Sequence, residues 1–559
     1  MRPFNGLVTS SNALFLLGKS RIISLTADSQ NVSGLASASQ ETLFCYTSGR
    51  WLYNEQRQLD LRYVRFDVEG LCKTAGDVLG APCTQITKLR GGLYNKVFSL
   101  KTDAGEELLA RIPNPNAGSS RVVIASEVAT LDFLRNGLDI PVPEVVAWSS
   151  PSQHPNLVGA EYILMKRMPG QQLSDVWDGM TQAQRFELVR SLVAIEAKLV
   201  AAKMSGYGSL YYRETYPDGI SLDGMLPSSW STAKSFVLGP STDRRFWVDG
   251  RGALDLDRGP WASAAEYFSA VAKREIECIR TSAINEPSLM DFGRKATARE
   301  AHIHLLNQFL IVLPHILPHL PFCCPVLLHQ DLHLDNIFVD STDPTKISGI
   351  IDWQSTTSAP LFMQARFPSV FDCDDPYPWG AVLPELPDDF DSLSKNAKIK
   401  AREQLERVRL KKFYEMAARK FNPAIPRAME ALLNKNDDDP VSYIFPLLEQ
   451  TAVDGPLPLQ ELLIEIFERW DEICKRHGSR SGFPCPISYS QAEISRFREL
   501  VQEYAVALCE FTGYLAQVGG GRDGWVSNGE FENAMRVFDE HRDELERLRR
   551  RVDDILFVL

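Results

Sequence analysis

The chain has 559 residues, of which 60 are basic and 72 acidic, and its formal net charge is −12. At about 100–200 residues per domain, this length predicts two to four folding units. A hydrophobic content of 44%, with 10% aromatic residues, excludes a globally disordered chain. The acidic excess argues against a general nucleic-acid binder, which needs a basic surface, but it does not exclude a local basic cleft.

The first 40 residues differ in composition from the rest of the chain. They contain Arg2, Lys19 and Arg21 but only one acidic residue, Asp28, together with eight serines. This composition is typical of a mitochondrial transit peptide, and it is equally compatible with a disordered N-terminus. The apolar run at residues 13–17 is too short for a secretory signal.

The sequence predicts no membrane-spanning segment and no disulfide framework. The longest apolar stretch, residues 305–328, is interrupted by one asparagine, two histidines and four prolines, whereas a spanning helix needs about 20 apolar residues. The ten cysteines contain no Cys-x-x-Cys pair, which predicts reduced, mostly buried thiols.

Alternating apolar and polar residues predict a small sheet after a helical lead-in at residues 41–83. Residues 84–168 contain three predicted strands, one amphipathic helix from about residue 120 to Gly137, and two further strands. We therefore expect a small antiparallel-sheet lobe with one helix.

The remaining chain is predicted to be mainly helical. Long amphipathic stretches occur at residues 185–202, 264–281 and 298–312, and residues 381–559 are almost entirely of helical character. The predicted architecture is thus α+β and bilobal: a sheet lobe (84–168), a mostly α-helical lobe with the catalytic and metal loops (169–380) and a helical extension of that lobe (381–559).

The most specific motif lies at residues 329–339 (HQDLHLDNIFV) and is followed by Asp352. Its order is Asp331, Asn336 five residues later, and Asp352 after a predicted strand. In phosphoryl transfer an aspartate orients the acceptor hydroxyl and takes its proton, while an asparagine and a second aspartate provide oxygen ligands for Mg²⁺. A polar loop with only structural capping residues is the alternative, but it would not require an aspartate, an asparagine and a second aspartate in this order.

The predicted sheet lobe contains residues that also suit phosphoryl transfer, but their patterns are less specific. Gly91 and Gly92 form a predicted turn whose backbone N–H groups can approach phosphate oxygens. Arg111 occurs where a kinase has its strand lysine, and Glu127 where the carboxylate partner of that lysine belongs. Arginine in place of lysine is a departure, because a guanidinium is bulkier than an ammonium group.

These residues resemble the aminoglycoside phosphotransferase and choline kinase superfamily of protein-kinase-like folds. The resemblance extends from about residue 85 to residue 379 and implies ATP and Mg²⁺ as cofactors. It implies that Asp331 is the catalytic base, that Asn336 and Asp352 bind the metal, and that Arg111 with Glu127 holds the α- and β-phosphates. It also implies further nucleotide contacts at the phosphate loop and at the connector between the lobes: Gly91, Gly92, Asn95, Met165 and Met168. Gln330 replaces the glycine that usually precedes the catalytic aspartate.

Four longer segments resemble a fungal group called altered inheritance of mitochondria protein 9. They are residues 44–52 (FCYTSGRWL), 208–212 (GSLYY), 258–261 (RGPW) and 352–354 (DWQ). This resemblance implies a mitochondrial location and favours the transit peptide, but it does not supply the acceptor.

Two functions remain open at this stage. The first is an ATP- and Mg²⁺-dependent phosphotransferase that acts on a hydroxyl group of a small molecule. The second is a catalytically idle kinase-like module that binds nucleotide or partners and supports mitochondrial maintenance, which Arg111 and Gln330 favour. A protein kinase is disfavoured, because Asp352 is followed by Trp-Gln instead of Phe-Gly and no Ala-Pro-Glu motif occurs after it.

Overall fold

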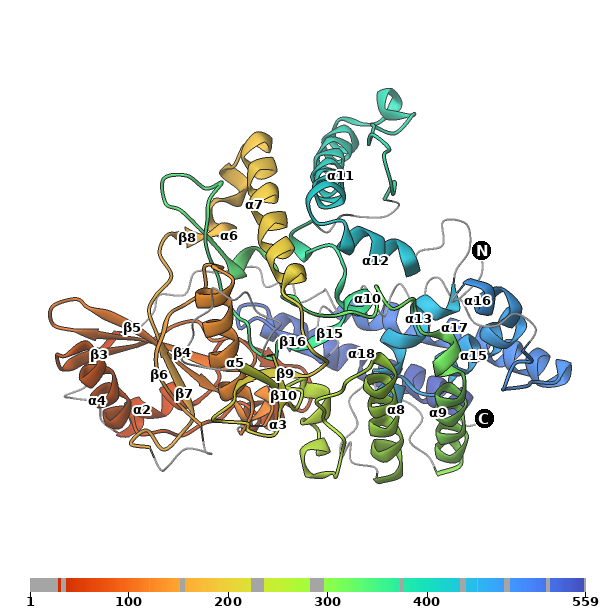
Figure 1. Cartoon of the computed structure of the whole chain (residues 1–559), viewed down its shortest axis with the longest axis horizontal. Helices are drawn as coiled ribbons and strands as arrows, with labels where there is room; N and C mark the ends of the chain where they lie inside the picture. Colours follow the sequence, from red (N-terminus) through yellow and green to blue (C-terminus); the bar gives the residue numbers. More distant parts are fainter. Residues whose placement is uncertain are drawn as a thin grey trace.

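The computed structural model describes residues 29–31, 37–119, 121–150, 156–222, 236–281, 296–371, 373, 377–432, 439–449, 451–476, 483–518 and 523–556. Most of the predicted transit peptide, residues 1–28 and 32–36, therefore lies outside the described residues. Figure 1 shows a sheet lobe at one end of the molecule and helices filling the other end.

The sheet lobe is a six-stranded antiparallel sheet with the strand order β1-β3-β4-β5-β7-β6. The predicted pattern of three strands, a helix and two strands is observed. The strands and helices are β1 (Ser29–Asn31), β3 (Cys83–Lys88), β4 (Asn95–Thr102), β5 (Glu107–Pro113), α5 (Val123–Asp132), β6 (Val145–Ser149) and β7 (Tyr162–Met165). The edge strand β1 is an addition, because it comes from the region that we expected to precede the fold.

The lead-in contains more than the expected helices. Its elements are α2 (Ser37–Phe44), β2 (Arg50–Trp51), α3 (Glu55–Asp60) and α4 (Val68–Leu79). Helix α4 begins where the Asp67 carboxylate accepts a hydrogen bond from the Gly70 N–H, and it ends at Gly80, whose φ of 72° suits glycine. The buried face of α4 packs against the sheet, with Leu71 and Ala75 fully buried beside Phe98.

The helical lobe follows β7 and surrounds the loops that carry the main motif. Its helices are α6 (Leu173–Val176), α7 (Gln182–Ala201), α8 (Ala264–Thr281), α9 (Ala296–Ile316) and α10 (Leu361–Gln364). Helix α7 begins with a capping box, in which the Thr181 hydroxyl accepts from the Gln184 N–H and the Gln184 side chain accepts from the Thr181 N–H.

Short strands support the loops of this lobe. They are β8 (Gln171–Gln172), β9 (Ser209–Tyr212), β10 (Ile220–Ser221), β11 (Phe236–Gly239), β12 (Pro325–Leu327), β13 (Ile337–Val339), β14 (Ile347–Ile350) and β15 (Ser358–Pro360). Strand β13 pairs with both β14 and β8, so the motif at residues 329–339 is anchored to the strand that follows the connector.

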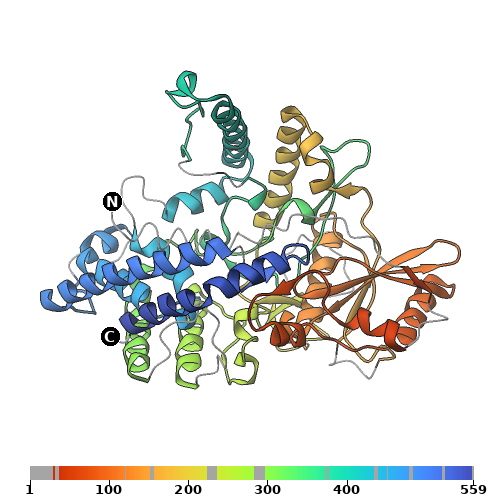
Figure 2. The same cartoon turned by 180° about the vertical axis from the view of Figure 1, so that it is seen from behind.

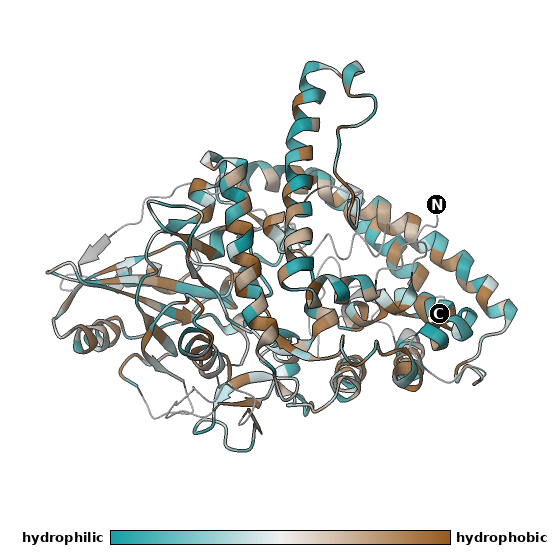
Figure 3. Cartoon of the chain, turned by 45° about the horizontal axis from the view of Figure 1, so that its top comes forward, coloured by the Kyte–Doolittle hydropathy of each residue, from teal (hydrophilic) through white to brown (hydrophobic). Residues whose placement is uncertain are grey.

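The extension after residue 381 is helical, as expected. Its elements are α11 (Lys395–Phe421), α12 (Ala424–Leu432), α13 (Pro440–Leu448), α14 (Thr451–Asp454), α15 (Leu457–Glu468), α16 (Trp470–Arg476), α17 (Gln491–Val518), β16 (Trp525–Val526) and α18 (Phe531–Leu556). The N-terminal part of α11 projects from the body (Figure 3), whereas its buried residues, which begin at Val408, pack in the core beside α7.

Helices α17 and α18 run alongside each other from the far end of the molecule to the sheet lobe (Figure 2). The apolar stripe of α18 faces its own domain: Leu545, Leu548, Val552 and Ile555 are buried in one cluster with α17. Within the described residues, every helix is too short or too polar to cross a bilayer. Together these elements form a protein-kinase-like bilobal α+β fold.

We expect Leu545→Ala to destabilise the protein by about 2–5 kcal/mol, because the Leu545 side chain is 1% exposed and its removal leaves a cavity between α17 and α18. Arg550→Ala on the same helix is the control. The Arg550 side chain is 77% exposed, so we expect a change within about 0.5 kcal/mol. Urea unfolding followed by circular dichroism measures both, and equal midpoints for the two variants would contradict this packing.

Candidate active site

The site lies where three segments of the chain meet. They are the phosphate loop (residues 89–95) between β3 and β4, the catalytic loop (residues 329–336) before β13, and the metal loop (residues 352–355) after β14. Arg111 on β5 and Glu127 on α5 lie behind them in the sheet lobe.

A buried guanidinium joins the two lobes. Arg111 forms an ion pair with Glu127, and its Nη1 lies 3.5 Å from Oδ1 of Asp352. The side chains of Arg111 and Glu127 are 9% and 2% exposed, whereas the Asp352 side chain is 44% exposed. Burial lowers the pKa of Arg111, and the Asp352 carboxylate opposes that shift. The predicted pair is thus brought together, and it also contacts the predicted metal ligand.

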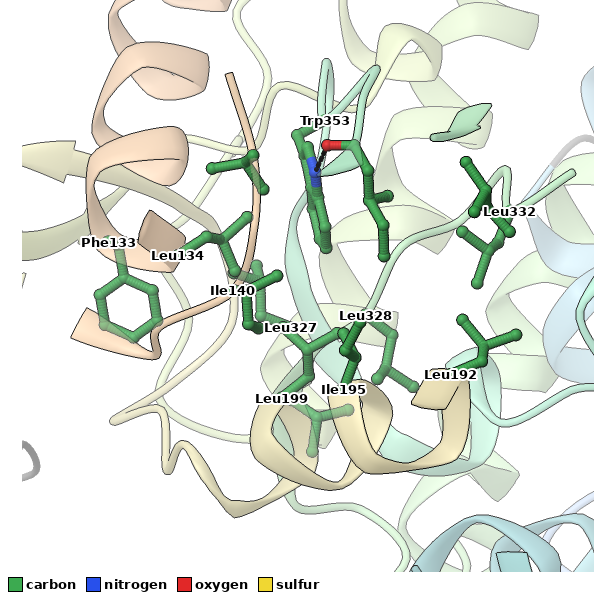
Figure 4. Packing of buried hydrophobic residues seen from close by; sticks show 14 of the residues in the cluster. Phe133, Leu134, Ile140, Leu192, Ile195, Leu199, Leu327, Leu328, Leu332 and Trp353 are labelled. Carbon is green, nitrogen blue, oxygen red and sulfur yellow. Dashed lines mark hydrogen bonds between the residues drawn. The ribbon is translucent and has the colours of Figure 1, made fainter. Parts of the chain in front are cut away.

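The metal loop is rigidly anchored at Trp353, which is fully buried. Its Nε1 donates to the Ile350 carbonyl at 3.0 Å, and the Thr356 hydroxyl donates to the Trp353 carbonyl at 2.7 Å. Figure 4 shows Trp353 in the same core as Leu327, Leu328 and Leu332, which flank and enter the catalytic loop.

Two residues of the metal loop have left-handed backbone conformations, with φ of 64° at Asp352 and 56° at Ser355. Such conformations cost about 1–3 kcal/mol each and persist only where the surroundings impose them. They turn the loop so that Asp352 reaches Arg111 and Gln354 reaches Asn95. The Asn95 Nδ2 donates to Gln354 Oε1 at 2.5 Å.

A neutral histidine orients the catalytic loop. His329 Nδ1 accepts from the Asp331 N–H at 3.1 Å, and His329 Nε2 lies 2.9 Å from the Ile351 carbonyl. Because a carbonyl only accepts, Nε2 must carry the proton. Burial lowers the pKa of His329, in agreement with this neutral form. The ring also packs edge-on against Trp353, with centroids 4.6 Å apart.

Asp331 points toward solvent, with 72% of its side chain exposed. The His333 Nε2 lies 3.6 Å from Asp331 Oδ2, and His333 Nδ1 lies 3.5 Å from Asp335 Oδ2. The two carboxylates raise the pKa of His333 to about 10. His333 in turn holds the pKa of Asp331 below its usual value, so Asp331 is ionised at neutral pH.

Asn336 is buried, and its side-chain amide faces back into the loop. Nδ2 donates to the Asp331 carbonyl at 2.9 Å, which leaves Oδ1 as the oxygen that a cation could use. Asn336 Oδ1 and the partly exposed Asp352 carboxylate are hard oxygen donors, and Mg²⁺ is typically held by few protein oxygens together with phosphates and water. The two residues therefore fit Mg²⁺. Among the described residues, no group of three or more His, Cys, Asp or Glu side chains could hold a metal by itself.

The phosphate loop presents its backbone N–H groups. In the described part of the chain, the N–H groups of Gly91, Gly92 and Leu93 donate no hydrogen bond, whereas the Leu93 carbonyl accepts from Asn114 and Asn116 at 3.3 Å each. Unpaired successive N–H groups form an anion-binding concavity. Gly91 permits a close approach, because a Cβ there would lie 2.9 Å from the Asn95 carbonyl oxygen.

Met165 and Met168 are both buried, at the two ends of the connector between the lobes. Met165 ends β7, and Met168 packs on Gly349 of β14 so closely that a Cβ at Gly349 would lie 2.2 Å from Met168 Cε. Gln172, just beyond the connector, donates to the Asp335 carbonyl at 2.9 Å and ties the connector to the catalytic loop.

Gln330, which stands in place of the usual glycine, is held by the helical lobe. The Gln330 amide donates to Gln364 Oε1 of α10 at 2.8 Å. Gln364 is itself buried and also accepts from the Leu328 N–H at 3.0 Å. Gln330 is therefore held toward α10.

Sequence reasoning missed three functional neighbours: His329, His333 and Gln354. Each lies two residues from a predicted site residue, and both histidines stand within the quoted motif, so a search for polar groups next to Asp331 and Asp352 would have found them.

We expect Arg111→Met to destabilise the fold by about 3–5 kcal/mol, because it leaves the Glu127 carboxylate buried without its partner. The double variant Arg111→Met with Glu127→Met removes both charges and should recover most of that loss. Urea unfolding of the three proteins measures this. A double variant as unstable as Arg111→Met alone would contradict the pairing.

The raised pKa of His333 predicts a specific pH dependence. Because this pKa lies above the ordinary value of about 6.5, the stabilisation from the charged ring is fully present below pH 6.5 and is lost as the pH rises through about 10. We therefore expect the difference in Tm between the wild type and His333→Gln to shrink between pH 6.5 and pH 10. A constant difference across that range would contradict a charged ring between Asp331 and Asp335.

Comparison with known proteins finds one matching family model and several fungal relatives. Residues 85–222 and 280–363 match the model of the phosphotransferase enzyme family, APH. A subtelomeric hrmA-associated cluster protein of Aspergillus fumigatus is 35% identical over 361 residues, which cover 59% of this chain and 69% of that protein. Altered inheritance of mitochondria protein 9, mitochondrial, of Saccharomyces cerevisiae is 22% identical over 570 residues, covering 89% of this chain and 88% of that protein.

Among solved structures, a ternary complex of streptomycin, ATP and APH(2'')-IIa matches 72% of this chain and 97% of its own, with 13% identity and a TM-score of 0.35. The predicted resemblance to the aminoglycoside phosphotransferase superfamily and to the altered inheritance of mitochondria group is confirmed by the family match and these relatives. The chain belongs to the same family as the Aspergillus fumigatus protein, and its residues 85–222 and 280–363 match the phosphotransferase enzyme family.

Proposed function

We propose that this protein is an ATP- and Mg²⁺-dependent phosphotransferase that acts on a hydroxyl group of a small molecule. The observation that carries the proposal is the contact of the Arg111 guanidinium with both Glu127 and Asp352. This contact joins the sheet lobe to the metal loop at one polar centre. Within the described residues, the N–H groups of the phosphate loop at Gly91, Gly92 and Leu93 donate no hydrogen bond, which suits phosphate oxygens.

In this proposal Asp331 is the catalytic base. Its carboxylate is exposed and ionised, so it can orient the acceptor hydroxyl and take its proton. The hydroxyl oxygen then bonds to the γ-phosphorus as the bond from that phosphorus to the bridging β–γ oxygen breaks, and ADP leaves. Asn336 and Asp352 would hold Mg²⁺, which neutralises phosphate charge when it is bound.

The sheet lobe would bind the nucleotide. Gly91, Gly92 and Asn95 would contact phosphate oxygens, Arg111 held by Glu127 would contact the α- and β-phosphates, and adenine would meet the connector between Met165 and Met168. A planar guanidinium can contact a carboxylate and a phosphate together, which makes arginine compatible with this role.

We also propose a mitochondrial location, with a transit peptide that lies within residues 1–40 and precedes β1, because β1 is part of the sheet. The relatives named altered inheritance of mitochondria protein 9 support it, as does the acid-poor, serine-rich composition of that segment.

A second candidate function is a catalytically idle module that binds nucleotide or a partner. It is favoured by Arg111 and Gln330, which replace the lysine and the glycine that are usual at these two positions. The two candidates differ in turnover and in their response to Mg²⁺–ATP.

We expect Asp331→Asn to abolish phosphate transfer while sparing nucleotide binding. Turnover should be measured on a broad panel of hydroxyl-bearing metabolites, and binding by thermal shift, where ATP at 100 times Kd stabilises the protein by about 2.7 kcal/mol. Asp139→Asn is the matched control, because the Asp139 side chain is fully exposed and its φ of 49° is one that asparagine tolerates.

The control should keep both activities. Binding without transfer in the wild type would favour the idle module. The absence of any shift with Mg²⁺–ATP would overturn the phosphotransferase and leave only an idle module that binds a partner.

A further inference from the structure

The segment formed by residues 46–53, here called the strap, overlaps the motif at residues 44–52 to which the proposed function assigns no role. It lies in the lead-in, far from Asp331 in sequence. On one side it contacts residues 523–528, which contain β16 and lie between α17 and α18; this connection is here called the hairpin, after the pair of helices that it joins. On the other side it contacts the phosphate loop.

The strap and the hairpin form a two-stranded antiparallel sheet. Trp51 of β2 pairs with Trp525 of β16, and Arg50 pairs with Val526. Beyond this ladder, the Leu52 N–H donates to the Gly524 carbonyl at 2.9 Å.

Two tryptophan side chains stabilise this pairing, because each donates a hydrogen bond from its indole N–H to the other segment. Trp51 belongs to the strap, is 1% exposed, and donates from Nε1 to Asp523 Oδ2 at 3.2 Å. Trp525 belongs to the hairpin and donates from Nε1 to the Tyr46 hydroxyl at 3.0 Å. The Trp525 ring covers Gly49, where a Cβ would lie 2.4 Å from Nε1. Only glycine admits the indole at this point.

The opposite side of the strap reaches the phosphate loop through one side chain. The Ser48 hydroxyl donates to the Gly91 carbonyl at 3.0 Å. Because the Leu93 carbonyl is held by Asn114 and Asn116, two carbonyls of the loop are bound from outside.

The loop is supported further at Tyr94 and at the start of β4. The Arg244 guanidinium lies 3.8 Å from the centroid of the Tyr94 ring. The Lys96 ammonium donates to the Arg62 carbonyl, and the Arg62 guanidinium stacks over Trp51 of the strap at 4.3 Å. The strap thus contacts the region of the loop directly at Gly91 and indirectly through Arg62.

From this chain of contacts we propose that Ser48 is a positioning residue for nucleotide phosphate and that the hairpin holds the strap in place for it. By fixing the Gly91 carbonyl outward, Ser48 orients the following peptide units so that the N–H groups of Gly92 and Leu93 face the cleft. The inference rests on the proposed function only where it assigns phosphate to this loop.

The experiment uses the full chain and two readouts, one of which needs no nucleotide. Native-state trypsin cleavage after the exposed Arg90, quantified by mass spectrometry, reports local opening of the loop, because Gly91 on the other side of that bond is half-buried. The Kd for Mg²⁺–ATP reports its competence to bind. Two variants break the support: Ser48→Ala removes the hydroxyl, and Gly49→Ala pushes Trp525 away from the strap.

Each variant has a matched control. Ser48→Thr keeps the hydroxyl, and Gly513→Ala in α17 adds a methyl group with no atom within 4 Å. We expect Ser48→Ala and Gly49→Ala to speed cleavage at Arg90 and to raise the Kd for ATP by about three- to ten-fold, the effect of one lost hydrogen bond. Both controls should stay within two-fold of the wild type, taking two-fold as roughly the smallest resolvable change.

Unchanged cleavage at Arg90 in both Ser48→Ala and Gly49→Ala would overturn the inference, even if their Tm falls. Faster cleavage with an unchanged Kd would also overturn it, because the strap would then support the loop without positioning phosphate. Failure of the wild type to bind ATP would count against the proposed function, and the cleavage rates would still decide whether the strap holds the loop.

Discussion

The arrangement of the site depends on one buried cation between two carboxylates. Arg111 is fixed by the sheet, Glu127 by α5 and Asp352 by the metal loop, so a single guanidinium sets the relative position of three elements. Its planar fork of donors can contact two carboxylates at once, whereas an ammonium group offers one compact point of charge. The usual lysine is therefore replaced by a group that also restrains the lobes.

The catalytic and metal loops are held from the core side, while their two carboxylates are exposed on the other side. Trp353 and the neutral His329 pack together and bond to backbone carbonyls, which fixes both loops at their bases. The groups proposed for chemistry, Asp331 and Asp352, project from these anchors and remain substantially exposed. A rigid base with accessible carboxylates is the arrangement that positioned proton transfer requires.

Much of this could be predicted from the sequence, and the limits have physical causes. The spacing of Asp331, Asn336 and Asp352 between apolar runs predicted two loops anchored on strands, and alternation predicted five of the six strands of the sheet. The contact of Asn95 with Gln354 spans 259 residues, and no local periodicity encodes it. The strand β1 was missed because its short polar sequence carries no alternation, and the sheet edge that it covers is formed elsewhere in the chain.

The pairing of β2 with β16 constrains the order in which the molecule can be completed. Chains are synthesised from the N-terminus, and domains generally fold as they emerge. Residues 50 and 51 leave the ribosome early, yet their partners at residues 525 and 526 appear only after more than nine-tenths of the chain has been made. A truncated product that lacks the last two helices would retain the segments that form its sheet and its catalytic loop, but it would lack the partner strand of the strap. The contact that holds the strap can therefore form only near the end of translation.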